Sequence, residues 1–381
     1  MSSFNRKRVW RDSKLEDLVF FQRGFDITQS QQREGPYPVI SSSGVTSYHD
    51  EFKVNGPGVV IGRKGTLGSV HFTAGDYWPH DTTLWSKDLK GNNPRFVYYF
   101  LHSLDFKRFD VGNSNPTLNR NHIHDLAISI PPPSVQNNIA DVLSAYDELM
   151  ENNRRRMEFL EEAARLLYRE WFVRLRFPGH EHARLTNGIP QGWERVPTPE
   201  AIEINPTTKL SDEEEHWYVE MADLPTDSMV IQNAIKRDGR SGSKFRNGDT
   251  LLARITPCLE NGKTGFVNFM ADGAAGRGST EFIVLRSKRV TPEFVYCLAR
   301  THAFRGNAIK SMIGSSGRQR VQESCFEKFM VLIPPRSLLD SFSESAEPIF
   351  QQIKVLHAQN QKLRAARDLL LPRLMSGEIA V

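Results

Sequence analysis

Cysteine is scarce in this chain, and its three cysteines lie far apart at Cys258, Cys297 and Cys325. They form neither a disulfide framework nor a metal-binding spacing, so we interpret them as buried or incidental thiols in a reducing cytoplasm. Long apolar runs are also missing, since none approaches the roughly 18 residues that cross a bilayer. The basic N-terminus "MSSFNRKRVWRD" has no apolar core after it, which argues against a signal peptide. We therefore expect a cytoplasmic protein without membrane contact.

Catalytic motifs are missing as well. "ENGKTG" is similar to the end of a phosphate-binding loop, but Pro257 stands where the first glycine of that loop belongs. "HIHD" (His122–Asp125) has metal-ligating side chains, yet four adjacent residues of an extended segment cannot all point inward, so a solvated turn is favoured. There is no Gly-rich cofactor loop after a predicted strand and no Asn-Pro-Pro-aromatic or Asp-Pro-Pro-aromatic box of an amino-methyltransferase. The residues predict no catalytic, metal or cofactor site.

The chain does contain a repeated phrase. "LAISIPPPSVQNNIADVL" (Leu126–Leu143) returns as "FMVLIPPRSLLDSFSESA" (Phe329–Ala346), each with an apolar run, Ile-Pro-Pro, a serine and a helical pattern. Pro131 then corresponds to Pro334, an offset of 203 residues. The net charge of +4 permits a nucleic-acid partner without requiring one.

Both copies of the phrase lead into a heptad seam, with gaps that alternate between four and three residues. The first seam consists of Ile139, Leu143, Tyr146, Met150, Asn153, Met157, Leu160, Ala164, Leu167 and Trp171. The offset gives the second seam: Phe342, Ala346, Ile349, Ile353, Leu356, Asn360, Leu363, Arg367, Leu370 and Leu374. The shared phase indicates a duplication rather than two unrelated helices.

Two prolines, Pro348 and Pro372, affect the predicted extent of the second helix. Pro348 lies inside the seam, where proline costs about 3 kcal/mol unless it occupies a first turn. We expect a short helix at about 337–346, a long helix from near Pro348, and an end at Pro372.

The segments before each helix also match. "GPGVVIGRKGTLGSVHF" (Gly56–Phe72) and "RNGDTLLARITPCLENGKTGFVNF" (Arg246–Phe269) each predict a strand, a basic Gly-containing turn and a strand. The predicted domains are 1–133 and 179–336 for the globular units and 134–178 and 337–381 for the helices. The predicted fold class is α+β, with two mixed α/β domains separated by two long helices that pack as an antiparallel coiled coil with pseudo-twofold symmetry.

Loop composition suggests a ligand for the globular units. Arg reads guanine bidentately, Asn and Gln read adenine, and Ser, Thr and backbone amides hold phosphates. Such side chains could simply form hydrophilic turns, but their recurrence at equivalent places favours DNA. The candidate DNA-binding residues are Ser42, Ser43, Arg63, Lys64, Thr66, Asn113, Asn115, Asn119, Arg120, Arg254, Thr256, Lys263, Ser315, Ser316, Arg318, Gln319 and Arg320.

The order of parts resembles the specificity subunit of type I restriction-modification systems over essentially the whole chain. Stretches that carry the resemblance include "VIGRKGTLG" (Val60–Gly68), "IPQGWE" (Ile189–Glu194), "GSTEFIVLR" (Gly278–Arg286) and "LLPRLMSGEI" (Leu370–Ile379). The resemblance implies one target-recognition domain for each half of a bipartite site on double-stranded DNA. It also implies two modification subunits, which carry S-adenosylmethionine and methylate adenine, and motor-nuclease restriction subunits. This chain would then be non-catalytic and hold no cofactor of its own. Two alternatives stay open, a coiled-coil scaffold that binds proteins and a nuclease or methyltransferase with an unfamiliar site.

Pseudo-twofold symmetry fixes a register for the two helices. If the axis is centred on the first seam, Asn153 faces Asn360 and Met157 faces Leu356. Another register would bury each Asn against an apolar side chain, at about 1–3 kcal/mol per unpaired group. The residues expected to pack between the helices are Leu143, Met150, Asn153, Met157, Leu160, Ile353, Leu356, Asn360 and Leu363.

Overall fold

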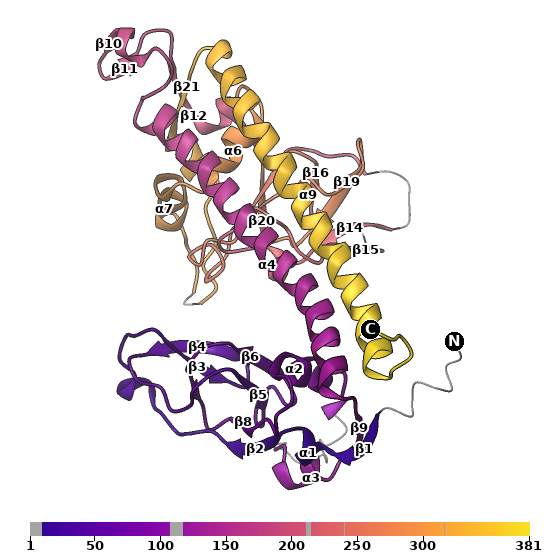
Figure 1. Cartoon of the computed structure of the whole chain (residues 1–381). Coiled ribbons are helices and arrows are strands. Elements are labelled where there is room, and N and C mark those ends of the chain that lie inside the picture. Colours follow the sequence, from indigo (N-terminus) through magenta and orange to yellow (C-terminus); the bar gives the residue numbers. More distant parts are fainter. Residues whose placement is uncertain (1–9, 107–116, 211–214, 240, 316) are drawn as a thin grey trace. The chain divides into compact units, whose positions relative to one another are not determined.

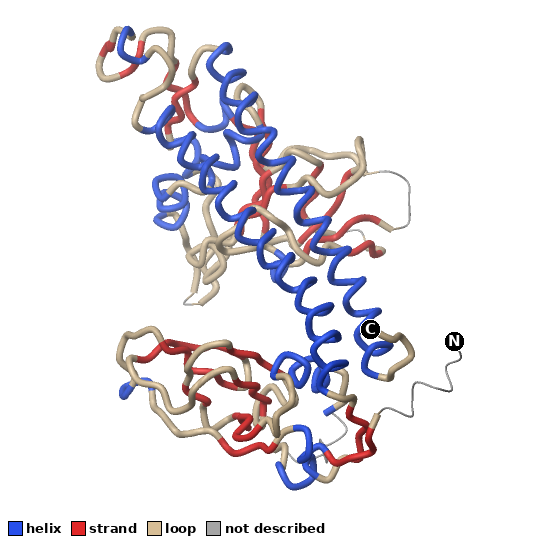
Figure 2. The backbone as a smooth tube through the Cα atoms, viewed as in Figure 1, coloured by secondary structure: helices blue, strands red, loops and turns tan. Residues whose placement is uncertain are grey.

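The computed structural model describes residues 10–106, 117–210, 215–239, 241–315 and 317–381. The chain forms two compact units: unit 1 is Met1–Met150 with Gln361–Val381, and unit 2 is Glu151–Asn360. Two long helices, α4 (Pro133–Tyr168) and α9 (Arg336–Met375), each contribute residues to both units (Figures 1 and 2). None of the described helices is long and apolar enough to cross a membrane.

Unit 1 contains two principal sheets. The larger has the antiparallel order β2-β8-β5-β6, and the smaller has the order β4-β3-β7. The strands of these sheets are β2 (Phe20–Arg23), β3 (Tyr37–Ser41), β4 (Gly44–His49), β5 (Gly58–Gly62), β6 (Val70–Thr73), β7 (Trp78–Pro79) and β8 (Thr83–Asp88). The remaining elements are β1 (Arg11–Lys14) paired with β9 (Ala127–Ile130), the helices α1 (Leu15–Leu18), α2 (Pro94–His102) and α3 (Arg120–His124), and the 3-10 turn η3 (Gln29–Gln31).

Unit 2 also has two principal sheets, both four-stranded, in the orders β13-β20-β17-β18 and β15-β14-β19-β16. Their strands are β13 (Ile202–Ile204), β14 (His216–Val219), β15 (Ile235–Arg237), β16 (Ser243–Arg246), β17 (Thr250–Ala253), β18 (Thr264–Phe266), β19 (Ala275–Gly278) and β20 (Phe282–Ser287). Two short pairs join β10 (Leu185–Thr186) with β11 (Ile189–Pro190), and β12 (Glu194–Pro197) with β21 (Met330–Ile333). The short helices and turns are η5 (Arg169–Val173), η6 (His180–His182), α5 (Thr198–Ala201), η7 (Met221–Asp223), α6 (Pro292–Ala299), α7 (His302–Lys310) and α8 (Cys325–Lys328).

The two units share one topology apart from β16, which has no counterpart among the described strands of unit 1, and this shared topology explains the repeated phrase. The strand order β2-β8-β5-β6 matches β13-β20-β17-β18, and β1–β9 matches β12–β21. In the small sheets, β7 runs parallel to β3 and β19 runs parallel to β14. The predicted α+β architecture, with two β-rich units and two long helices packed together, is therefore confirmed.

Each unit has its own hydrophobic core, and the long helices complete both. In unit 1, Leu143 of α4 and Leu374 of α9 are buried with Phe96 and Phe100 of α2. In unit 2, Ala164 and Tyr168 of α4 are buried with Phe342 of α9. Burying an aromatic or aliphatic side chain contributes about 1.5–3 kcal/mol, so these contacts tie the helices firmly to the sheets.

The helices are antiparallel within unit 2. Asn153 Nδ2 donates a hydrogen bond to Asn360 Oδ1 at 2.9 Å, and the rings of Trp171 and Phe342 lie 6.1 Å apart. Both pairs belong to the register predicted from the heptad pattern, and Asn153 is buried. The paired amides satisfy each other inside an otherwise apolar seam.

The predicted break at Pro348 is wrong, because α9 continues from Arg336 to Met375. Pro348 lies on the exposed side of the helix, while Ala346 and Phe350 on either side of it are buried. The carbonyl of Glu344, which the proline leaves without a backbone partner, is therefore accessible to water. Pro372 is also exposed and does not end the helix. Tertiary packing here overrides the local preference of proline.

Candidate nucleic-acid interface

Arg63 follows β5 in unit 1 and is held by its backbone. Its amide donates to the carbonyl of Thr82 at 2.8 Å, and its carbonyl accepts from the amide of Leu118 at 2.9 Å. The guanidinium is half-buried and reaches the carbonyl of Asp81 at 3.5 Å. Burial, and after it the neighbouring Arg23, lowers the pKa of Arg63. The side chain still carries its charge at neutral pH, since Arg does not deprotonate in proteins.

Arg254 follows β17 in unit 2 and has the same backbone frame. Its amide donates to the carbonyl of Glu281 at 3.0 Å, and its carbonyl accepts from the amide of Val321 at 2.9 Å. Its guanidinium lies 3.6 Å from Glu323, and its buried Nε has no partner among the described residues. We call this arrangement, an arginine whose backbone amide and carbonyl are both hydrogen-bonded to neighbouring segments, the arginine frame. It begins the loop after the same strand in both units, so the duplication extends to the positions of these two arginines.

Ser42 and Ser43 form the turn between β3 and β4, next to the loop that contains Thr66. The amide of Ser42 donates to Thr82 Oγ1 at 3.4 Å, and its carbonyl accepts from Ser69 Oγ. A side chain on Gly62 would collide with the carbonyl oxygen of Thr66 at 2.1 Å, so this loop folds back closely on itself. The structure therefore brings Ser42, Ser43, Arg63, Lys64 and Thr66 into one cluster of turns, with Ser43 and Thr66 exposed.

Asn119 and Arg120 stand at the start of α3. Asn119 Oδ1 accepts from the amide of Asn121 at 3.0 Å, which is the N-cap interaction of that helix. Arg120 is exposed, and the hydrogen bond between Leu118 and Arg63 places this segment beside the arginine frame. Asn113 and Asn115 lie outside the described residues.

In the polar loop that follows α7 in unit 2, some candidate side chains contact other residues and others are exposed to solvent. Arg320 makes a two-pronged ion pair with Glu281, with contacts of 2.6 and 2.9 Å, and this hydrogen bond is the largest cause that lowers the pKa of Glu281. The Gln319 carbonyl accepts from the Thr256 amide at 3.0 Å, and Thr256 Oγ1 accepts from the Gln319 amide at 3.0 Å. Ser315 and Arg318 are exposed, and Ser316 lies outside the described residues.

Lys263 is turned toward its own unit. Its Nζ donates to the carbonyl of Met221 at 2.6 Å, and its carbonyl accepts from the amide of Ala253. Lys263 thus joins the loop after β17 to η7, and its ammonium is less available to a ligand than the exposed Arg318.

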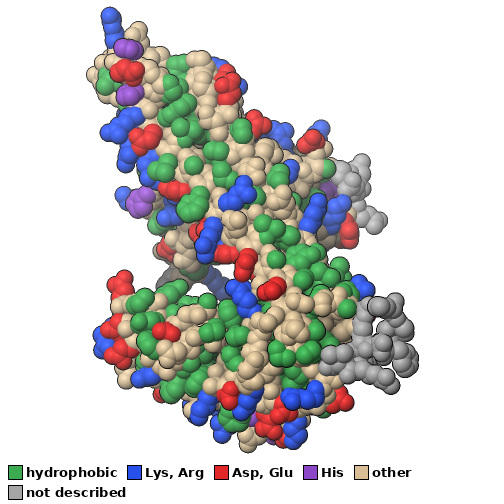
Figure 3. All heavy atoms as spheres, viewed as in Figure 1, with side chains coloured by type: hydrophobic (Ala, Val, Ile, Leu, Met, Phe, Trp, Pro, Cys, Tyr) green, Lys and Arg blue, Asp and Glu red, His purple; other side chains and the backbone are tan. Residues whose placement is uncertain are grey.

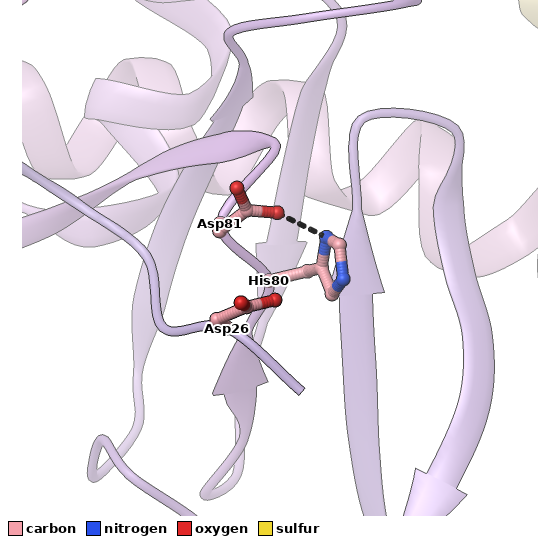
Figure 4. A group of neighbouring side chains, drawn as sticks. All are labelled: Asp26, His80 and Asp81. Carbon is pink, nitrogen blue, oxygen red and sulfur yellow. Dashed lines mark ion pairs between the residues drawn. The ribbon is translucent and has the colours of Figure 1, made fainter. Parts of the chain in front are cut away.

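A group of possible metal ligands lies beside the first arginine frame (Figure 4). Ligand atoms of Asp26, His80 and Asp81 are within 4.8 Å of one another. Both oxygens of Asp81 are already engaged, one with Arg23 Nη2 at 2.9 Å and the other with His80 Nδ1 at 3.1 Å. These contacts connect β2 to the turn before β8, so the group fits a structural role that supports the loop of Arg63.

The "HIHD" segment is not the solvated turn expected from the sequence. Arg120–His124 forms the helix α3, and His124 is buried, with its Nε2 accepting from the amide of Phe21 at 2.9 Å. Asp125 pairs with Lys14 at 2.7 Å. Burial lowers the pKa of His124, which keeps the imidazole neutral as an acceptor.

Sequence reasoning passed over one further group of basic residues. The segment "KRDGRSGSKFR" (Lys236–Arg246) has five Lys or Arg and one Asp in eleven residues. Its end, Lys-Phe-Arg, alternates polar and apolar residues as a half-buried strand does. In the structure Lys244 and Arg246 are exposed on β16, while Phe245 between them is buried.

Comparisons with known proteins agree with one another. The family model described as "Type I restriction modification DNA specificity domain" matches residues 7–162. The MjaIX specificity subunit of Methanocaldococcus jannaschii is 24% identical over 306 residues, or 75% of this chain and 69% of that relative. The EcoEI specificity subunit of Escherichia coli is 30% identical over 158 residues, which cover 39% of this chain and 26% of that relative.

Two comparisons cover nearly the whole chain. The MjaVIII specificity subunit of M. jannaschii is 19% identical over 98% of this chain and 93% of its own length. The crystal structure of a type I S subunit from M. genitalium aligns over 96% of each chain with a TM-score of 0.61 and 15% identity, which shows the same fold. The duplicated β-rich units, the helix pair and the sequence relatives lead to one assignment: residues 7–162 match the type I restriction modification DNA specificity domain, and the whole chain is similar in sequence and fold to the specificity subunits of type I restriction-modification systems, which recognise the DNA target and are not themselves catalytic.

Proposed function

We propose that this chain reads a bipartite target on double-stranded DNA, with one half-site read by each recognition domain, 1–133 and 179–336. The observation that carries the proposal is the arginine frame, which fixes Arg63 and Arg254 at equivalent places in the two units. An arginine whose backbone is held by neighbouring segments presents a guanidinium of defined direction. Such a group suits bidentate contact with the O6 and N7 atoms of guanine.

The surrounding residues supply the other contacts in this proposal. Exposed Ser43, Thr66 and Ser315 suit phosphate oxygens, and exposed Arg120 and Arg318 suit either phosphates or base edges. Ser42, Lys64, Asn119, Thr256, Lys263, Gln319 and Arg320 shape the loops or add charge beside these groups. Asn113, Asn115 and Ser316 belong to the same proposed set.

The partners in the proposal are two methyltransferase subunits, which bind S-adenosylmethionine, and restriction subunits that act as motor and nuclease. The helical regions 134–178 and 337–381 would hold the two copies. A pocket of about 530 Å³ in unit 1 is lined by Phe100, Ile128 and Met375. A pocket of about 850 Å³ in unit 2 is lined by the equivalent residues Leu298, Val331 and Phe172. Two copies of one partner need such equivalent surfaces.

Substitution of the two arginines tests the proposal in the assembled methyltransferase complex. Methylation-sensitive sequencing of host DNA first gives the target. Arg63→Ala should then weaken discrimination at one half-site only, and Arg254→Ala at the other, each by about 1–3 kcal/mol, or roughly 5- to 150-fold in relative affinity. Binding to targets with single base changes in each half-site measures this.

Lysine variants at the same positions are the matched controls. Arg254→Lys keeps the charge but loses the bidentate fork, so it should restore general affinity without restoring base discrimination. Equal loss at both half-sites for either alanine variant would contradict separate reading by the two domains. A complex that assembles normally but shows no preference among DNA sequences would favour a protein-binding scaffold instead.

A further inference from the structure

The small sheet of unit 2 has a cationic face that the loop predictions did not include. Its strands β14, β15, β16 and β19 are labelled in Figure 1. Arg277 on β19 stands opposite Tyr218 on β14 and Lys244 on β16, and His216 stands opposite Arg237 on β15. Directly opposed residues share a face, as do residues two apart on a strand. Arg237, Lys244, Arg246 and Arg277 therefore all belong to one face of this sheet.

The opposite face of the sheet belongs to the core. Val219 and Phe245 are fully buried there, in a cluster with Phe282. This arrangement fixes the direction of the cationic face, since a register slip of one residue would bury Lys244 and Arg246 and expose Phe245. Lys244 and Arg246 are thus held outward by the packing of Phe245 between them.

Two of the four cations are exposed and available. Within the part of the chain that the structure describes, the side chains of Lys244 and Arg246 make no hydrogen bond or ion pair, and both residues are exposed. Arg237 stacks on the ring of Tyr218 at 3.4 Å and lies 3.0 Å from Glu220. An exposed pair of this kind leaves Arg237 able to exchange partners, since it contributes only about 0.2–1 kcal/mol.

The fourth cation, Arg277, is buried beneath the others. Its relative exposure is 1%, and its Nη2 makes one long hydrogen bond, 3.5 Å, to the carbonyl of Arg237. Its Nε has no partner among the described residues. Among the described residues no carboxylate pairs with this buried guanidinium, so its charge is uncompensated there. The positive potential of this face is therefore larger than the exposed side chains alone produce, and an anion bound to the face would relieve it.

The cationic face continues into the arginine frame of the same unit. Lys244 and Arg254 line one pocket of about 250 Å³, together with Thr280. Arg246 lines a neighbouring pocket of about 310 Å³ with Lys209. A polyanion seated at Arg254 would thus pass over Lys244 and Arg246 without leaving the surface of unit 2. We call Arg237, Lys244 and Arg246 the cationic strip.

We propose that the cationic strip binds backbone phosphates of the DNA half-site read by unit 2, with Lys244 and Arg246 as the two direct contacts. This inference rests on the proposed function. Lysine and arginine two residues apart on a strand are separated by about 7 Å, since each residue rises about 3.4 Å. Contacts to phosphate position the protein on the duplex and carry no sequence information. The strip therefore contributes affinity and alignment, while the loops of unit 2 read bases.

The salt dependence of binding tests this proposal. Each phosphate contact contributes about 0.9 to the slope of log affinity against log salt concentration on B-form DNA. Lys244→Gln and Arg246→Gln should each lower the slope by about 0.9, and the double variant by about 1.8, with base discrimination unchanged. Fluorescence anisotropy of a labelled target duplex at several salt concentrations measures the slope for the assembled complex.

The matched control removes two other exposed lysines of unit 2. Lys310→Gln with Lys328→Gln changes the charge equally on α7 and α8 and should leave the slope unchanged within about 0.3. Glutamine keeps most of each side chain's apolar stem, and a thermal melt of every variant checks folding.

Three results would overturn the inference. The slope could stay at its original value in the double variant while the unmodified complex binds its target selectively. The control variant could lower the slope as much as the strip variant, which would show a general effect of charge. The strip variant could lose its partner subunits with the DNA slope intact, which would assign the strip to an acidic protein surface. By contrast, an unmodified complex with no sequence preference would mean that the proposed function itself has failed.

Discussion

The small sheets of the two units occupy equivalent places but differ in chemistry. In unit 1 the strand pairing sets Trp78 opposite Val39, where unit 2 has Arg277 opposite Tyr218. The hairpin of unit 1, Tyr37–His49, contains no Lys or Arg and exposes Val45 and Tyr48. The small sheet of unit 2 carries the cationic strip, in which Lys244 and Arg246 lie on β16, a strand without a counterpart among the described strands of the small sheet of unit 1.

The larger sheets of the two units, by contrast, are alike. Their strand order is the same in both units, and each leads into an arginine frame with the same two backbone hydrogen bonds. Backbone geometry is thus retained after the duplication, while outward side chains have diverged. The proposed reading of two different DNA half-sites requires this pattern, because one backbone must then present two different surfaces.

The units also differ in how they attach to the helices. In unit 2, Glu161 of α4 is buried and accepts from Tyr296 Oη at 2.5 Å and from the amide of Met229 at 2.6 Å. In unit 1, Asp147 of α4 is half-buried and accepts from Tyr99 Oη at 2.6 Å and Arg367 Nη1 at 2.5 Å. Elsewhere on the visible face of the helix pair, charged side chains of both signs are interspersed with hydrophobic ones (Figure 3).

Removing the carboxylates of Glu161 and Asp147 should give the largest loss in the free energy of unfolding. The two losses should differ between unit 2 and unit 1. Glu161→Ala leaves a buried hydroxyl and an amide without their acceptor and removes the carboxylate that lies 3.9 Å from Arg300, so we expect a loss of about 3–5 kcal/mol in the free energy of unfolding. Asp147→Ala should cost about 1.5–3 kcal/mol because its site is wetter. Urea unfolding gives the totals, and hydrogen exchange identifies the unit that opens. Equal losses would show that burial does not distinguish the two attachments.

Substitution of the paired amides, Asn153 and Asn360, should give an intermediate loss of stability. Asn153→Leu leaves Asn360 facing an apolar side chain, which should cost about 1–3 kcal/mol. The double variant Asn153→Leu with Asn360→Leu should regain most of that stability while relaxing the register of the helices. A thermal-melt double-mutant cycle measures the coupling, and a cysteine pair placed across the helices reports the register. Additive losses in the double variant would show that the two amides do not act together.

The ion pair of Arg320 with Glu281 gives the smallest effect and is specific to unit 2, since Thr82 is the equivalent residue of unit 1. The Arg320 guanidinium lowers the pKa of Glu281 in the folded chain. Its stabilisation is therefore present above the ordinary pKa of about 4.3 and is lost as the pH falls through the lowered value. At this solvent-exposed site the stabilisation should be small, because solvent screens the pair. Comparing Glu281→Gln with the unmodified chain at pH 7 and below pH 4 measures it, and a difference that grows on acidification would contradict the assignment.

Local patterns in the sequence were sufficient to predict the register of the two helices. They were also sufficient to find Arg63 and Arg254 at the ends of two predicted strands. The heptad spacing and the offset of the repeat together fix the pairing of Asn153 with Asn360. Arg63 and Arg254 could be found because each follows a recognisable strand before a glycine-containing turn. In these cases the signal lies within one segment and its copy.

Features that depend on contacts between distant segments could not be predicted from local patterns. The helix continues through Pro348 because flanking residues on its other side are buried by unit 2. Loop composition made Arg320 and Lys263 candidates for DNA binding, but it could not predict their contacts with Glu281 and the Met221 carbonyl. The cationic strip needs the parallel pairing of β14 with β19, which joins segments more than fifty residues apart.

The core of unit 1 has a consequence for how the chain is made. Leu374 and Met375, near the C-terminus, are buried among residues from the first 150 positions. A ribosome adds roughly 5–20 residues per second, so the N-terminal sheet waits about 10–45 s for the helix turn that closes its core. The half of the protein that is synthesised first is therefore the last to be finished. During this interval the apolar side chains that later receive Leu374 remain open to chaperones, and a chain truncated before Leu374 would leave the core of unit 1 incomplete.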